Sequence, residues 1–231
     1  MMESHSCGHM KHSCIEKVPI FNHLSKEEMG EISRVSISRN VKKGELLFQS
    51  DELSEHLFIV HKGRVKIYRL AESGKEQIIR FIEEGDFIGE LSLFSKTVTA
   101  SFAEAMEDTE ICTIHQQDFH PLLLNYPTIS IKILEEFSNQ LRRTESLIEK
   151  LNSQDVEKRI ASYLLELMEE LNEVNLQLPI SKGELASFLG TTQETLSRRL
   201  SAFQQKGWIE LKGQRFIAIM RPEKLREKAT F

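Results

Sequence analysis

The stretch Ile180–Trp208 reads ISKGELASFLGTTQETLSRRLSAFQQKGW and decides the fold of the C-terminal part of the chain. Ser181 and Glu184 have the spacing of a capping box, which marks the start of a helix. Gly190 stands where the end of that helix needs a left-handed residue, and either of the two threonines after it can cap a second helix. Two short helices joined by a glycine-containing turn predict a helix-turn-helix.

The second of these helices has an apolar face and a polar face. Leu196, Leu200 and Phe203 are spaced four and three residues apart, as on the buried side of a helix. The remaining face carries polar side chains that can contact DNA. The candidate DNA-binding residues are Thr192, Gln193, Glu194, Ser197, Arg198, Arg199 and, from the first helix, Lys182.

Three of these candidates have a chemistry that suits base reading. Arg198 can donate two hydrogen bonds to a guanine edge, and Glu194 can accept one from a cytosine amine or hold the arginine in place. Ser197 is short enough to meet a base edge or a thymine methyl group. Two simpler interpretations stay open: Glu194 can be a capping-box residue, since it follows Thr191 by three, and Arg198 can bind phosphate without reading sequence.

The segment after the second helix and the charge of this region agree with such a module. Trp208–Leu211 and Arg215–Ile219 read as two strands around a Lys-Gly-Gln turn, which is typical of the wing of a winged helix. The whole chain has a net charge of -5, but residues 181–231 hold ten Lys and Arg against five Asp and Glu, which gives +5 there and -10 elsewhere. A basic module on an acidic body favours DNA binding, although chance clustering on a solvated surface gives the same numbers.

The part of the chain from residue 38 to residue 114 is expected to be built of strands. Short runs rich in Ile, Val, Leu and Phe lie between or beside glycines, and Arg64–Tyr68 alternates polar and apolar residues. This pattern predicts a sandwich or barrel. Before it, Ser25 and Glu28 form another capping box, which predicts a helix over Ser25–Val35. The expected strands are Glu45–Phe48, His56–Val60, Arg64–Arg69, Gln77–Ile82 and Glu110–Ile114.

A longer helix is expected over Thr128–Asn152, a stretch without Gly or Pro. Its apolar residues follow a heptad spacing of three and four, which favours pairing with a second copy of the chain. The same pattern would suit an amphipathic helix that packs on its own domain. The residues of the predicted dimer seam are Leu134, Phe137, Leu141, Thr144, Ile148 and Leu151. A further helix is expected over Val156–Leu171.

Three motifs resemble the CRP/FNR family of transcription regulators, and the resemblance covers nearly the whole chain. Residues 85–91, GDFIGEL, are similar to the family's β-roll motif. Residues 101–105, SFAEA, followed by 111–114, ICTI, are similar to the FNR branch. Residues 194–198, ETLSR, match the Glu-x-x-Ser-Arg pattern of that branch. Within it, the FNR-like proteins of lactic-acid bacteria, often called Flp, are the most similar.

The resemblance implies an α+β chain with a double-stranded β-helix of the jelly-roll, cyclic-nucleotide-binding-like type, a long dimerisation helix and a C-terminal winged helix-turn-helix. The expected parts are a His/Cys-rich tail at 1–18, a sensory β-roll at 19–127, the dimerisation helix at 128–153 and the DNA-binding domain at 154–231. The resemblance also implies that Glu194, Ser197 and Arg198 read TTGAT-like half-sites arranged as an inverted repeat. Contact with RNA polymerase through surface loops such as Ser95–Thr99 is implied by the family alone.

Cyclic AMP is not an expected ligand. In the cAMP-binding branch, an Arg-Ser pair some ten residues after Gly-Glu-Leu holds the cyclic phosphate. Here Gly89–Leu91 is followed by Lys96–Ala100, and Val98 falls about where the arginine would be. Without that cation, the phosphate loses its main charge-assisted hydrogen bonds.

The sensor is expected to involve the cysteines. The chain has three, Cys7, Cys14 and Cys112, and an odd, low count is not a disulfide framework. In the FNR branch, a cysteine at the position of Cys112 joins three N-terminal cysteines to hold a [4Fe–4S] cluster, and this chain has only two there. The FNR-like proteins of lactic-acid bacteria suggest a thiol/disulfide switch between an N-terminal cysteine and the central one.

Three interpretations of the sensor remain open. The first is a reversible disulfide between Cys112 and Cys7 or Cys14, without a cofactor. The second is a metal centre that holds zinc or an iron–sulfur cluster. The third is that these residues have no sensory role: the N-terminal segment is a tail, and Cys112 is a cysteine buried in the core. The candidate sensor residues are His5, Cys7, His9, His12, Cys14 and Cys112.

Several classes of protein are excluded or disfavoured by the sequence. No window approaches 18 consecutive apolar residues, and the first 14 residues lack the apolar core of a secretory signal, so we expect no membrane span and a cytoplasmic location. No nucleophile elbow, P-loop, HExxH motif or dinucleotide fingerprint is present, so an enzyme is not expected.

Overall fold

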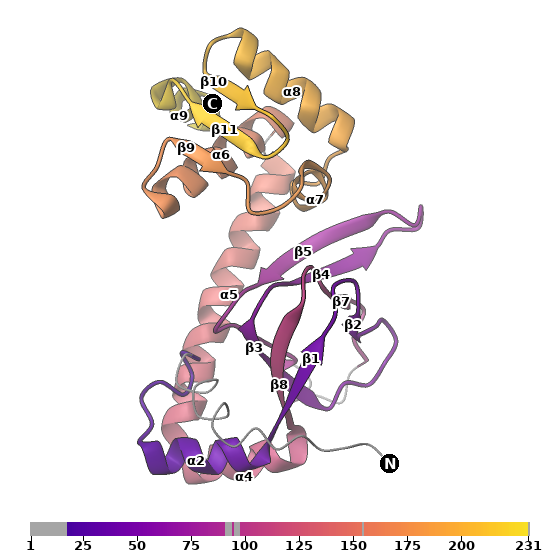
Figure 1. Cartoon of the computed structure of the whole chain (residues 1–231), viewed down its shortest axis with the longest axis vertical. Coiled ribbons are helices and arrows are strands. Elements are labelled where there is room, and N and C mark those ends of the chain that lie inside the picture. Colours follow the sequence, from indigo (N-terminus) through magenta and orange to yellow (C-terminus); the bar gives the residue numbers. More distant parts are fainter. Residues whose placement is uncertain (1–17, 91–93, 95–97, 154, 231) are drawn as a thin grey trace. The chain divides into compact units, whose positions relative to one another are not determined.

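The computed structural model describes residues 18–90, 94, 98–153 and 155–230. The chain forms two compact units, Met1–Gln140 and Leu141–Phe231, and the boundary between them falls inside one long helix (Figure 1). No helix in the described ranges is long and apolar enough to cross a membrane.

The first unit is built around strands that form two antiparallel four-stranded sheets in the described ranges. One sheet has the order β1-β8-β3-β6 and the other β2-β7-β4-β5, as in a jelly roll. The first sheet comprises β1 (Ser36–Val41), β8 (Thr109–His115), β3 (His56–Lys62) and β6 (Phe87–Ile88). The second comprises β2 (Leu46–Phe48), β7 (Phe102–Ala105), β4 (Val65–Leu70) and β5 (Glu76–Ile82). The five expected strands and the α+β fold class are confirmed, with ends that differ by one or two residues.

Strand β3 is buried on both faces, which explains why its sequence is a continuous apolar run rather than an alternating one. Phe58 and Val60 belong to the apolar cluster that also holds residues of the second sheet, such as Val65 and Ala103. Leu57 and Ile59 belong to a different cluster, which includes residues of the helices. The sheet with β3 therefore separates the interior of the roll from the helices that cover its other face.

Three helices contribute to this covering layer. They are α2 (Lys26–Val35), α4 (Gln116–Asn125) and the N-terminal part of α5 (Pro127–Ser153). Ser25 begins α2 with the expected capping box: its hydroxyl accepts a hydrogen bond from the Glu28 amide, and the Glu28 carboxylate accepts one from the Ser25 amide. Met29 and Ile32 then reach the core from this helix.

The long helix α5 divides its apolar residues between two directions. Ile129 and Ile133 are buried in the core of the first unit, and Phe137 packs against that core. On another face, Leu134 and Leu141 remain 63% and 59% exposed, and Ile131 is 56% exposed. Phe137 also meets the ring of Phe94 edge to face, at 6.1 Å between centroids.

The exposed apolar residues of α5 coincide only in part with the predicted dimer seam, which stays a prediction. The exposed apolar stripe of α5 includes Ile131, which was not among the predicted seam residues, whereas Phe137 contacts the core of its own unit. Thr144 is exposed, and the side chains of Ile148 and Leu151 lie outside the described part of the helix.

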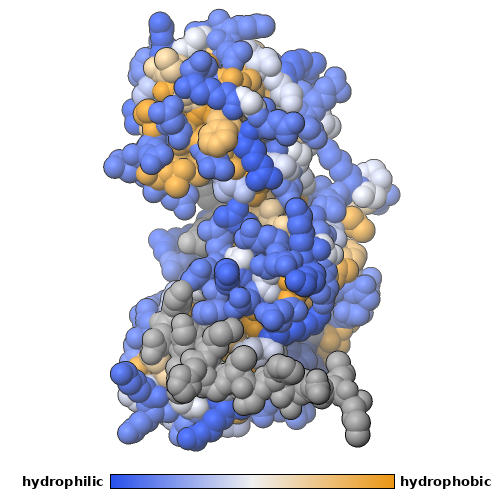
Figure 2. All heavy atoms as spheres, in the orientation of Figure 1, coloured by the Kyte–Doolittle hydropathy of each residue, from blue (hydrophilic) through white to orange (hydrophobic). Residues whose placement is uncertain are grey.

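The second unit is a winged helix-turn-helix. Its helices are α6 (Val156–Leu171), α7 (Lys182–Phe188), α8 (Gln193–Gln205) and α9 (Pro222–Thr230). Its antiparallel sheet has the order β10-β11-β9, with β10 (Ile209–Lys212), β11 (Phe216–Ile219) and β9 (Asn175–Gln177). The expected hairpin is β10 and β11, and β9 adds a third strand to it. Figure 2 shows apolar side chains gathered over this small sheet, where Val174, Phe216 and Met220 are exposed.

Candidate nucleic-acid interface and sensor cysteine

The turn between α7 and α8 is fixed by caps on both sides. Ser181 begins α7 with a capping box in which its hydroxyl accepts a hydrogen bond from the Glu184 amide. Gly190 then adopts a φ of +64°, a left-handed conformation that favours glycine. Thr192 caps α8, because its hydroxyl accepts a hydrogen bond from the Thr195 amide at 3.1 Å.

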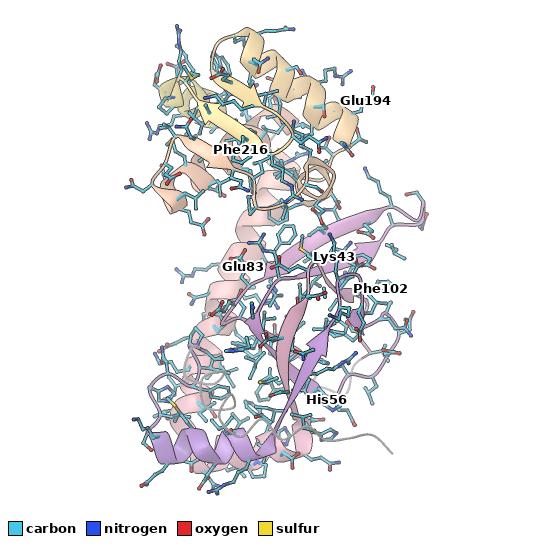
Figure 3. All side chains as sticks on the ribbon, viewed as in Figure 1. Lys43, His56, Glu83, Phe102, Glu194 and Phe216 are labelled. Carbon is cyan, nitrogen blue, oxygen red and sulfur yellow. The ribbon has the colours of Figure 1, made fainter. Side chains whose placement is uncertain are left out.

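These caps assign a position to Glu194. Because the cap is Thr192 and not Thr191, Glu194 is the second residue of α8, and the capping-box position belongs to Thr195. Its carboxylate is exposed at the N-terminal turn of the helix, where Figure 3 shows it projecting outward. The interpretation of Glu194 as a capping-box residue is therefore wrong, and its carboxylate is available to a ligand.

The orientation of α8 is set by its apolar face. Leu196, Leu200 and Phe203 are fully buried, and the ring of Phe203 lies 5.2 Å from that of Trp208. The C-terminal end of the helix is tied to the wing, because the Gln204 side-chain oxygen accepts a hydrogen bond from the backbone of Leu211 at 2.7 Å. With this face held, the opposite side of α8 is directed outward.

The outward face presents a compact set of polar groups. Gln193, Glu194 and Arg198 are exposed and Ser197 is partly exposed. Glu194 and Arg198 are one helical turn apart, so both can meet the same surface. Neither side chain forms a hydrogen bond or ion pair with another of the described residues. This combination of free donors and acceptors on a rigid helix is what base reading requires.

Two of the other predicted DNA-binding residues lie outside this exposed set on α8. Lys182 begins α7 and is only partly exposed. Arg199 follows Arg198 on α8, but its guanidinium forms an ion pair with Glu157 of α6 at 2.7 Å. The sequence offered no signal for that pair, because its members are 42 residues apart.

The central cysteine lies in the first unit. Cys112 occupies β8, paired with Ser38 of β1 and Ile59 of β3. Its side chain is 2% exposed, and its Sγ lies 3.6 Å from the Oγ of Ser38. It belongs to the same apolar cluster as Ile129 and Ile133 of α5.

The remaining predicted sensor residues lie outside the described part of the chain. They are His5, Cys7, His9, His12 and Cys14. Among the residues that are described, no three His, Cys, Asp or Glu side chains are grouped so that they could hold a metal ion.

The interior of the roll holds one buried carboxylate from the GDFIGEL motif. Glu90 is 4% exposed, and one of its oxygens lies 3.4 Å from a guanidinium nitrogen of Arg80. Val98, at the position where cAMP-binding relatives are expected to carry a cation, is exposed and apolar. The expectation that cAMP is not a ligand stays a prediction.

Comparison with known proteins gives the same division of the chain. Residues 38–126 match the cyclic nucleotide-binding domain, and residues 158–228 match the Crp-like helix-turn-helix domain. The chain is 33% identical to the probable transcriptional regulator flp of Lacticaseibacillus casei, over 95% of this chain and all of that protein. It is 26% identical to the fumarate and nitrate reduction regulatory protein of Vibrio cholerae, over 99% of this chain and 93% of that protein.

The fold has a counterpart among solved structures. FixK2 from Bradyrhizobium japonicum superposes with a TM-score of 0.72 at 27% identity, over 84% of this chain and 96% of that one. From its motifs, its fold and its relatives, we conclude that the chain belongs to the CRP/FNR family of transcriptional regulators, which bind DNA and are not enzymes.

Proposed function

We propose that this regulator binds DNA as a homodimer, reads TTGAT-like half-sites arranged as an inverted repeat, and changes its DNA binding with redox state or oxygen. In this proposal residues 19–127 sense, 128–153 dimerise and 154–231 bind DNA, in the cytoplasm. The observation that carries the DNA-reading part is the outward face of α8, on which Glu194 and Arg198 are exposed and unpaired within the described structure.

The roles of the side chains follow from their chemistry. Arg198 donates two hydrogen bonds to a guanine edge, Glu194 accepts from a cytosine amine, and Ser197 lies against a thymine methyl group or base edge. Lys182, Thr192 and Gln193 flank this set and contact the backbone of the DNA, which fixes the register of the helix.

The two-fold symmetry of the target requires a dimer. The exposed stripe of α5, with Ile131, Leu134 and Leu141, is the surface that we assign to it, since burying three large apolar side chains stabilises association. A dimer of this kind presents two copies of α8 about 34–36 Å apart, which is one turn of DNA. Its contact with RNA polymerase is a further part of the proposal and rests on the family.

The redox part of the proposal rests on Cys112 and on the relatives. The chain is 26% identical to the anaerobic regulatory protein of Haemophilus influenzae and to fumarate and nitrate reduction regulators. We assign the response to a disulfide between Cys112 and Cys7 or Cys14. Two thiols lose two protons and two electrons as the S–S bond forms, and a peroxide that accepts them is reduced to water and an alcohol or a second water.

The position of Cys112 connects this chemistry to α5. A disulfide to the N-terminal segment requires the buried thiol to leave or open the cluster that it shares with Ile129 and Ile133. Repacking of this cluster changes how α5 is held, and the packing of the two α5 helices sets how the DNA-binding domains are oriented. DNA then selects the dimer whose recognition helices fit the repeat.

The experiment measures the affinity of anaerobically purified protein for a TTGAT inverted repeat and for a duplex with both half-sites scrambled. Tight, two-fold symmetric binding to the first duplex supports the DNA part, and equal affinity for both duplexes contradicts it.

Counting free thiols per protomer before and after mild peroxide treatment tests the switch. A loss of two thiols together with a change of affinity supports the disulfide, whereas bound zinc, or iron with sulfide, near one site per protomer identifies a metal centre instead.

A further inference from the structure

Two neighbouring arginines on α8 have different surroundings. Arg198 is exposed, and no hydrogen bond or ion pair joins its side chain to the rest of the described chain. Arg199 turns toward α6, where its Nη1 donates to the Oε1 of Glu157 at 2.7 Å. The Nε of Arg199 is sealed from solvent without a hydrogen-bond partner among the described atoms. The stem of Arg199 therefore lies against the protein, in a direction different from that of Arg198.

The acceptor of this ion pair is shared by a third helix. Glu157 lies in the first turn of α6, and only 17% of its side chain is exposed. Its second oxygen lies 3.0 Å from the Nζ of Lys228 on α9. The same ammonium lies 3.2 Å from Asp155, the residue that caps α6. One carboxylate thus joins α6, α8 and α9.

A second contact ties the start of α6 to the turn of the helix-turn-helix. The Nε of Arg159 donates to the backbone oxygen of Leu189, which ends α7, at 2.9 Å. The first turn of α6 therefore holds α7 through Arg159 and α8 through Glu157. The buried apolar face of α8 sets which side of the helix faces outward, and the Gln204–Leu211 hydrogen bond holds its C-terminal end. Apolar contacts are not directional, so the ion pair with Glu157 constrains the rotation of the helix more narrowly than those contacts do.

Rotation of α8 determines what its outward face can read. Successive residues of a helix are about 100° apart, so a small rotation about the axis moves Glu194 and Arg198 together relative to the base edges. A bidentate contact with guanine tolerates little misplacement. A side chain that holds the rotation of α8 will therefore affect sequence discrimination without touching DNA.

We propose that Arg199 is a positioning residue that orients the recognition helix through Glu157, and that it is not a phosphate contact. This inference rests on the proposed base reading by α8. It assigns to Arg199 a role different from the DNA contact expected from its sequence position, and it makes Glu157, which does not face DNA, a determinant of specificity.

The test compares Glu157→Gln, Arg199→Gln and the double variant by fluorescence anisotropy at several salt concentrations, below the onset of thermal unfolding. The probes are the TTGAT inverted repeat and a duplex with one base pair changed in each half-site. Both single variants are expected to bind the first duplex about three- to tenfold more weakly, the loss of one partly exposed charge pair. The double variant should be no weaker than the weaker single one, because the pair acts as a unit.

The salt dependence separates positioning from phosphate contact. In a positioning role, all variants keep the salt slope of the unmodified protein and lose discrimination between the two duplexes. If Arg199 binds phosphate, Arg199→Gln lowers the slope by about one, and Glu157→Gln, which frees the arginine, leaves binding unchanged or tighter. That result overturns the proposal, as do unchanged affinity and discrimination in both single variants.

Two further variants keep the outcome interpretable. Lys228→Gln removes the other cation from Glu157 without touching α8, so it should lower the melting temperature and leave discrimination intact. Arg198→Ala tests the base reading itself. If Arg198→Ala leaves discrimination unchanged, the proposed function fails, whereas thermal unfolding of the single and double variants still shows whether residues 157 and 199 are coupled.

Discussion

At the scale of single residues, the outward face of α8 makes a sharp prediction about specificity. Replacing Arg198 by Ala should reduce discrimination against a changed guanine position by about 1–3 kcal/mol, because the bidentate contact is lost. Glu194→Gln should affect a different position of the half-site, because its carboxylate reads another base. Competition binding with a set of single base-pair variants measures both, and uniform weakening on all duplexes would instead identify phosphate contacts.

His56 predicts a pH dependence of stability. Desolvation and, second, the His115 ring, whose centroid is 5.0 Å away, lower the pKa of His56, while Glu55 opposes them. The unfolded chain therefore takes up a proton first as the pH falls below about 6.5, so stability is lost on acidification and not on alkalinisation. Because His56 is exposed, the effect is small. The melting temperature of His56→Gln should fall less than that of the parent between pH 7.5 and 5.5.

The sequence predicts where a residue lies when that depends on local spacing. The motif at 194–198 placed Glu194 and Arg198 on one face of a helix, and the cap at Thr192 is a local feature too. Arg199 could not be assigned in this way, because its environment depends on Glu157 in another helix. The same holds for Phe137: its heptad position predicts a place in the seam, and only the tertiary structure shows that it packs against the core of its own unit.

At the scale of elements, α5 carries the prediction about assembly. Leu134→Glu combined with Leu141→Glu places charges on the exposed apolar stripe and should convert a dimer into a monomer of 26.7 kDa. Light scattering coupled to gel filtration measures the mass. The matched control is Leu124→Glu, an 82% exposed leucine on α4 outside the stripe, which should leave the mass unchanged. Dimers that persist in the double variant would place the interface elsewhere.

Some strands and helices can be predicted from the sequence pattern, and others cannot. Strands with several apolar residues, such as β3, β4 and β8, are expected from the pattern, and their ends agree within two residues. Strand β1 was not expected, because only its two end residues are buried. Helix α4 was missed as well: Pro121 disfavours a helix interior, but Phe119 and Leu122 are buried in the core, and this packing outweighs the local cost.

At the scale of the whole molecule, the sensor and the DNA-binding part can be separated by mutation. Cys112→Ser should leave DNA binding intact and abolish its response to peroxide, because one partner of the disulfide is gone. Removing residues 1–14 should have the same effect, since it removes Cys7 and Cys14. Affinity for the inverted repeat before and after oxidation is the measurement. A response that survives both changes would place the sensor elsewhere in the chain.

The burial of Cys112 also affects how fast its thiol can be oxidised. A thiol that is 2% exposed reacts only during brief openings of its surroundings, so its oxidation rate is the reactivity of the free thiolate multiplied by the open fraction. Each further gain of about 1.4 kcal/mol in local stability lowers the open fraction tenfold, and the oxidation rate falls by the same factor. A short pulse of oxidant then passes with few copies converted, whereas sustained exposure converts the population. The packing of the core around Cys112 therefore sets how long an oxidant must be present before the protein responds.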